Sequence, residues 1–78
     1  MPRYYFNVRH NTAERDGEGS ELADIQAARL AAVRLSGELI QELDHSFWDS
    51  PDWRLEVTDA GQNTLFTLTF CAKEHDPG

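Results

Sequence analysis

The chain has 78 residues, the size of one small domain that buries only about 60–65% of the surface its unfolded form exposes. Fourteen acidic residues against seven basic ones give a net charge of −7, which disfavours general nucleic-acid binding. The lone cysteine, Cys71, excludes an internal disulfide and is typical of a reducing compartment. We expect one domain over residues 1–72 and a frayed tail over residues 73–78.

Neither a secretory signal nor a membrane-spanning segment is predicted. The opening residues Met1-Pro2-Arg3 lead directly into a patterned segment, without the apolar stretch of a signal peptide. No apolar run approaches the ~20 residues that span a bilayer. We therefore expect a cytoplasmic protein with no membrane partner.

The first elements are a strand and a helix. Residues 4–9 alternate in character, which predicts a half-buried strand, and Asn11 can turn the chain into a short returning strand over residues 12–15. The Gly-rich segment 16–20 predicts a loop. A helix over residues 24–44 follows, capped by Asp24 or alternatively by Ser20. The predicted strand presents Tyr4, Phe6 and Val8 on one face and Tyr5, Asn7 and Arg9 on the other, and the helix carries an apolar stripe of Ile25, Ala28, Ala32, Leu35, Leu39 and Leu43.

The second half predicts another hairpin. Such a helix would be ~30 Å long and exceed a strand of ~20 Å, so the loop over residues 45–52 should cover its end with Phe47 and Trp48. Strands are expected over residues 53–58 and 65–70, joined by a turn with Gly61 at a positive φ.

The resulting fold is α+β: a three- or four-stranded antiparallel sheet, built as β-hairpin, long helix and β-hairpin, with one helix packed on one face. We expect the first strand to lie beside the last, because these two strands are the most apolar. Leu35 and Leu39 should form the middle of the core.

Several segments resemble an uncharacterised family of short proteins from rhizobia and related alphaproteobacteria that is catalogued as a domain of unknown function. They are Pro2-Arg3-Tyr4-Tyr5-Phe6, residues 16–24, Ala27-Ala28-Arg29 and residues 53–59. The resemblance extends to about Phe70. It implies a stand-alone bacterial domain with no assigned activity, and it supplies no catalytic residues to carry over to this chain. The pair Ser36-Gly37 departs from the Ala/Glu-rich helix of that family. A more distant similarity is to antitoxin domains of the HicB kind, whose third strand before the helix and DNA-binding extension are missing here.

No catalytic, cofactor or metal site is predicted. The acidic residues around the first loop do not have the ligand spacing of a calcium-binding loop and favour a solvated turn near a helix N-terminus. The pair Cys71 and His75 is incomplete both as a zinc site and as a nucleophile with its base. Phosphate-binding loops and hydrolase motifs are also missing from the sequence. We therefore expect a protein that is not an enzyme. The acidic residues in question are Glu14, Asp16, Glu18 and Glu21.

The surface left for function is the sheet face away from the helix. It could be an ordinary solvated face, or it could bind a protein, since Tyr and Arg are enriched at interface anchors. Our leading hypothesis is a self-associating protein-interaction module, a homodimer formed through this face or through the edge of the strand that holds Arg54 and Glu56. The alternative is an antitoxin-like or regulatory small protein that binds a protein partner. The expected contact residues are Tyr5, Arg9, Arg54, Trp48 and Leu65.

Overall fold

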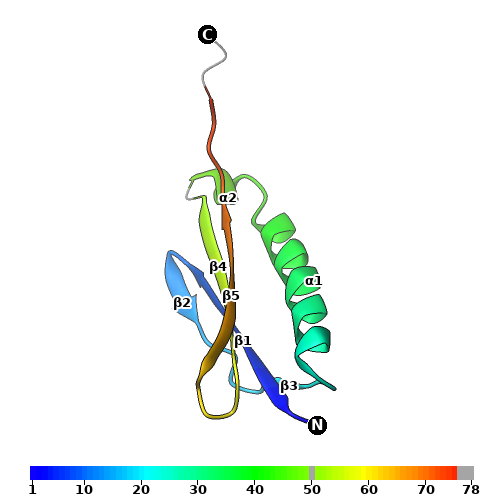
Figure 1. The fold of residues 1–78 in the computed structure, drawn as a ribbon. Coiled ribbons are helices and arrows are strands. Elements are labelled where there is room, and N and C mark those ends of the chain that lie inside the picture. The colour runs from blue at the N-terminus through cyan, green and yellow to red at the C-terminus, as the bar shows by residue number, and fades with distance from the viewer. Residues whose placement is uncertain (50, 76–78) are drawn as a thin grey trace.

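The computed structural model describes residues 1–49 and 51–75, so the end of the predicted tail, residues 76–78, lies outside the described residues. One antiparallel sheet has its strands in the order β2-β1-β4-β5, and β3 pairs with β1. Helix α1 lies along one face of this sheet, and α2 lies at the end where β4 begins (Figure 1). The α+β prediction is confirmed, but the described sheet has five strands and not three or four, because Ser20 and Glu21, at the end of the predicted loop, pair with β1 as the short strand β3. The elements are β1 (Arg3–His10), β2 (Thr12–Glu14), β3 (Ser20–Glu21), α1 (Ile25–Leu43), α2 (Ser46–Asp49), β4 (Asp52–Thr58) and β5 (Thr64–Cys71).

The predicted strand order is wrong. β1 pairs with β4, from Tyr5 opposite Thr58 to Arg9 opposite Arg54, and β5 lies at the edge of the sheet. The expectation that β1 and β5 are neighbours assumed that the most apolar strands are the most buried. The helix instead lies over β4, whose helix-facing side chains are completely buried, whereas those of β5 are half-buried or exposed. β4 is therefore not an edge strand, and the predicted interface along its edge does not exist.

The helix boundaries are confirmed. An Oδ1 atom of Asp24 accepts a hydrogen bond from the Ala27 N–H at 2.9 Å, so Asp24 is the N-cap that the sequence favours over Ser20. At the other end Asp44 leaves helical geometry with φ of 52°. Within residues 1–49 and 51–75, no helix combines the length and apolar character needed to cross a membrane.

The centre of the core differs from the one expected. Ala28, Ala32 and Ser36 recur every four residues along α1 and are completely buried, while Leu35 and Leu39 pack beside them and are only partly buried. Side chains this small let the helix backbone come close to the sheet. The space they leave is filled from the sheet side by the three fully buried residues of β4, which are Trp53, Leu55 and Val57.

The connections follow the predicted positions with two differences. Asn11 turns the chain with φ of 68°, as expected, but in the β4–β5 turn the positive φ belongs to Gln62 and not to Gly61. The predicted loop over residues 45–52 contains the one-turn helix α2. Phe47 packs against the core there, whereas Trp48 makes a T-shaped ring contact with Phe47 and stays 55% exposed. The end of α1 is thus covered by Phe47 and not by both aromatic residues.

Replacing Ser36 by alanine should stabilise the fold. The Ser36 hydroxyl is completely buried and has no hydrogen-bond partner among the described residues, so folding strips it of water without compensation. We expect Ser36→Ala to raise the free energy of unfolding by about 1 kcal/mol, measured by urea denaturation. The matched variant Ser36→Leu should lower the free energy of unfolding by about 1–3 kcal/mol, because β4 already fills the space that the larger side chain would need. If Ser36→Ala were less stable than the parent, the Ser36 hydroxyl would have to make a stabilising hydrogen bond in the folded chain.

Candidate functional site

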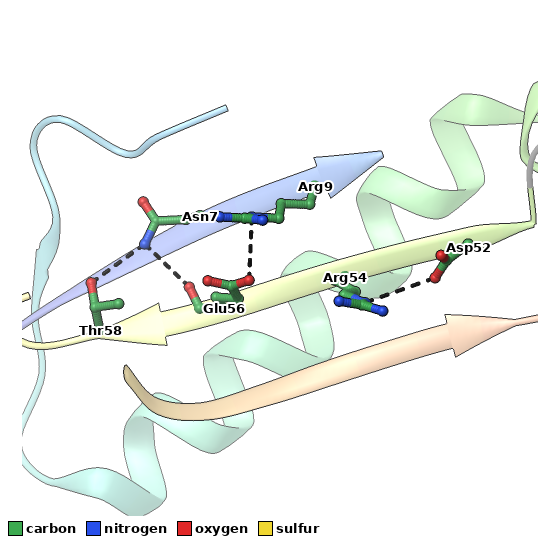
Figure 2. A network of polar contacts seen from close by, with 6 residues as sticks. All are labelled: Asn7, Arg9, Asp52, Arg54, Glu56 and Thr58. Atoms are coloured by element: carbon green, nitrogen blue, oxygen red, sulfur yellow. Dashed lines mark hydrogen bonds and ion pairs between the residues drawn. The ribbon is translucent and has the colours of Figure 1, made fainter. Parts of the chain in front are cut away.

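The sheet face opposite α1 carries a connected set of polar side chains (Figure 2). Asn7 lies at its centre on β1. Its Nδ2 donates to the backbone oxygen of Glu56 and to Oγ1 of Thr58, each at 3.3 Å, and both acceptors belong to β4. An asparagine at this position therefore links the two central strands through its side chain in addition to their backbone ladder.

Two arginines lie directly opposite each other on this face, Arg9 on β1 and Arg54 on β4. Like charges in this arrangement destabilise a sheet. Each arginine has a carboxylate beside it: Arg9 Nε lies 3.3 Å from Glu56 Oε1, and Arg54 Nε lies 3.9 Å from Asp52 Oδ1. Three of these four side chains are exposed and Glu56 is half-buried, so the pairs stabilise the fold by at most ~1 kcal/mol each. Their main consequence is that carboxylates of the same chain already neutralise the positive charges of Arg9 and Arg54 on this face (Figure 2).

Asp16 fastens the loop between β2 and β3 onto β1. Its Oδ2 accepts from the Phe6 N–H at 3.2 Å, and its Oδ1 accepts from the N–H groups of Glu18 and Gly19 at 3.1 and 3.0 Å. Its own N–H donates to Asn7 Oδ1 at 3.0 Å. Phe6 lies between the stretches of β1 paired with β2 and with β3, so the carboxylate takes the place of a strand partner there.

Gly19 allows this loop to approach β1 closely. Its φ is +72°, and a Cβ atom built on it would lie 2.9 Å from the side chains of both Arg3 and Tyr5. Only glycine combines that conformation with that proximity. Partial burial raises the pKa of the Asp16 carboxyl, but hydrogen bonds from Gly19, Phe6 and Glu18 and the positive charge of Arg3 lower it by more. The pKa of Asp16 therefore lies below its usual value.

The β4–β5 turn is held by a similar carboxylate. Asp59 Oδ1 accepts from the N–H groups of Gly61 and Asn63, both at 2.9 Å, and Asn63 Nδ2 donates to Asp59 Oδ2 at 3.2 Å. The two hydrogen bonds from Asn63 are the main reason that the pKa of Asp59 lies below its usual value. The turn therefore carries a negative charge fixed at one end of β5.

A pocket of about 440 Å³ lies between this turn and the Asp16 loop, on the sheet face opposite α1. Asn7, Arg9 and Glu56 form part of its wall, together with Asp16 and Asp59. Neither the cysteine nor any histidine lines it, and its carboxylates at positions 16 and 59 are engaged by N–H groups. Among the described residues, no three or more His, Cys, Asp or Glu side chains gather where they could hold a metal ion.

The structure separates the five predicted contact residues. Tyr5, Arg9 and Arg54 belong to the sheet face opposite α1, here called the polar face, as expected. Trp48 belongs to α2, next to the beginning of β4. Leu65 lies near the other end of the β4–β5 pair, where the register shifts by one residue between the pairs Val57–Phe66 and Thr58–Thr64, and it is exposed. These five residues do not form one patch.

Sequence reasoning missed the outer edge of β5. The Ala72 N–H donates to Pro51 O at 3.3 Å, so the backbone groups of residue 72 point toward β4. Because these directions alternate along a strand, the N–H and C=O groups of Cys71, Thr69 and Thr67 point away from β4. Beyond β5 the described part of the sheet has no further strand. All eight residues of β5 are uncharged, and that run was the signal available in the sequence.

The stability of the fold should depend on ionised Asp16. Because its pKa is lower in the folded chain than in the unfolded one, its contribution is complete above about pH 5 and is lost as the pH falls through the folded-state value. Asp16→Asn should lower the free energy of unfolding by about 1–2 kcal/mol at pH 7, because the amide nitrogen cannot accept from Phe6. Urea titrations from pH 7 to pH 3 should show a smaller loss on acidification in this variant than in the parent.

The control for this prediction is Glu14→Gln, which removes an exposed carboxylate of β2 near the same loop. It should leave both the stability at pH 7 and its decline with acid close to those of the parent. Equal pH profiles for Asp16→Asn and the parent would contradict the role given to the Asp16 carboxylate.

Comparison with known proteins gave one finding. No curated protein and no solved structure was found to match this chain. A family model described as a domain of unknown function (DUF6894) matches residues 3–71. The match begins at the first residue of β1 and ends at the last residue of β5, so it covers the whole sheet and α1. The chain therefore belongs to this family, DUF6894.

Proposed function

We propose that this chain is a non-enzymatic protein-interaction module that self-associates as a homodimer. The observation that carries the proposal is the edge strand β5. It directs the backbone groups of Thr67, Thr69 and Cys71 away from β4, where no described strand pairs with them, and its eight residues are uncharged. An edge of this kind is a template for another strand, and proteins that do not use such an edge normally shorten, charge or cover it.

The opposite edge of the sheet supports this reading by contrast. β2 has only three residues, and it ends at Glu14, which is followed by Arg15. A short edge beside charged side chains is poorly suited to pairing with another chain. The two edges of one sheet thus differ in length and in charge, and β5 alone has the properties of a contact surface.

The polar face is a weaker candidate for the interface. Arg9 and Arg54 are already paired with carboxylates of the same chain, and burying these ion pairs would require removing water from four charged groups. Pairing at the edge of β5 instead gives hydrogen bonds to backbone groups that otherwise depend on water. We therefore place the contact at the edge and not on the face.

Light scattering over a concentration series tests the proposal. In reducing buffer the mass should rise with concentration toward twice the 8.9 kDa of one chain. Thr69→Pro should abolish this rise, because proline removes an N–H that points away from β4 while leaving the β4–β5 hydrogen bonds in place.

The matched control is Thr69→Val, which changes the same side chain, keeps the N–H and suits a strand. It should dimerise like the parent, and circular dichroism should show that both variants are folded. A parent chain that stays at 8.9 kDa at every concentration would refute self-association. A dimer that Thr69→Pro leaves intact would refute the role of the β5 edge.

A further inference from the structure

We infer that β5 pairs antiparallel with β5 of a second copy, in the register that places Leu68 opposite Leu68. This inference rests on the proposed self-association and adds the identity of the bound strand and its alignment. A continuous sheet would then run through both copies, with the two-fold axis perpendicular to the sheet at Leu68. Because that axis preserves the two faces of the sheet, both copies of α1 would lie on the same side.

The backbone limits the registers to a few. The N–H and C=O groups that point away from β4, here called outward, belong to Thr67, Thr69 and Cys71. Hydrogen bonds between the two copies can form only where an outward residue of one β5 lies opposite an outward residue of the other. Every second alignment of the two strands is therefore excluded. Alignments centred on Thr67 and on Leu68 overlap seven of the eight residues of β5, and one centred on Thr69 pairs all three outward residues with one another.

Side-chain matching selects among the three. With Leu68 at the centre, Phe66 of each copy lies opposite Phe70 of the other, and Thr67 lies opposite Thr69. Aromatic and threonine pairs of this kind stabilise antiparallel strands by roughly 0.2–1 kcal/mol each. A centre at Thr67 places Phe70 opposite Thr64, and a centre at Thr69 places Phe66 opposite Ala72, so each pairs one phenylalanine with a small side chain in place of an aromatic ring.

The charges agree with a second copy as the occupant. A chain of net charge −7 repels its own copy, but pairing through β5 brings no charged side chain of the strand opposite another. Lys73 follows the end of β5 and the turn that holds the Asp59 carboxylate precedes its beginning, so an antiparallel second copy brings Lys73 of one copy to the strand end where the other copy carries Asp59. The only lysine of the chain thus lies near a fixed negative charge of the other copy.

The exposed apolar surface agrees as well. Phe70 is 36% exposed, although its ring contacts Trp53 edge-on with a centroid separation of 5.7 Å. On α1, Val33 is 58% exposed and lies on the side of the helix opposite Glu42. Glu42 lines a pocket together with residues of β1 and β2, so the Val33 side faces away from those strands. A neighbouring copy at β5 would cover part of this surface.

Cysteine cross-linking tests the register. The natural cysteine is first replaced by Cys71→Ser, and Thr67→Cys and Thr69→Cys are then made separately in that background. Both positions are exposed threonines, so the fold should tolerate the changes. One variant is isotopically labelled, the two are mixed in reducing buffer to exchange subunits, and the mixture is oxidised and analysed by mass spectrometry.

In the inferred register, residue 67 of one copy and residue 69 of the other have Cα atoms about 5.5 Å apart, within the range of a disulfide. Identical positions lie about 8 Å apart, beyond that range. The mixture should therefore yield cross-linked dimers that contain one labelled and one unlabelled chain, and each variant alone should yield few.

The other outcomes overturn the inference in different ways. Rapid cross-linking of Thr67→Cys alone or of Thr69→Cys alone would move the centre to that residue and refute the Leu68 register, while self-association would stand. A dimer by light scattering that cross-links in none of the samples would show that β5 strands do not pair. A chain that is monomeric by light scattering would refute the proposed function itself.

Discussion

The structure depends on the close packing of α1 against β4. Ala28, Ala32 and Ser36 let the helix approach the sheet, and Trp53, Leu55 and Val57 occupy the space that these small side chains leave. This contact contains most of the fully buried surface of a chain that has little core to bury. The packing of α1 on β4 also decides which strand is the most buried, because that strand is the one beneath Ala28, Ala32 and Ser36.

A second feature, the pair Asn7 and Asp16, organises the polar half of the molecule. Asn7 reaches across to β4 with its amide nitrogen and accepts from the Asp16 N–H with its amide oxygen. Asp16 satisfies three backbone N–H groups with one carboxylate. The acidic Gly-containing loop is thereby explained as a structural turn, since hydrogen-bond donors already surround the carboxylate that a cation would need.

The two features leave the sheet asymmetric. The helix covers β4 completely, whereas most helix-facing side chains of β1 and β5 are only half-buried, and the loop held by Asp16 lies beside β1, at the other side of the sheet from β5. β5 is consequently half-covered on one face and unpaired along its outer edge. Its eight residues carry no charge in a strongly acidic chain, and this lack of charge is the reason for proposing that the edge pairs with another strand.

The sequence by itself determined the longer elements. The alternation of residues 4–9, the cap at Asp24, the helical stripe and the second hairpin could all be predicted, because period, capping and turn chemistry are local properties, whereas the short elements β3 and α2 were not predicted. It also placed Tyr5, Arg9 and Arg54 on one face, since alternation alone assigns faces. Only the tertiary structure decided that β4 lies between β1 and β5, that Ser36 lies in the core, and that Trp48 and Leu65 belong to opposite ends of the β4–β5 pair. Strand order depends on which strand the helix covers, and that choice is made by contacts between residues distant in the chain, which no local pattern encodes.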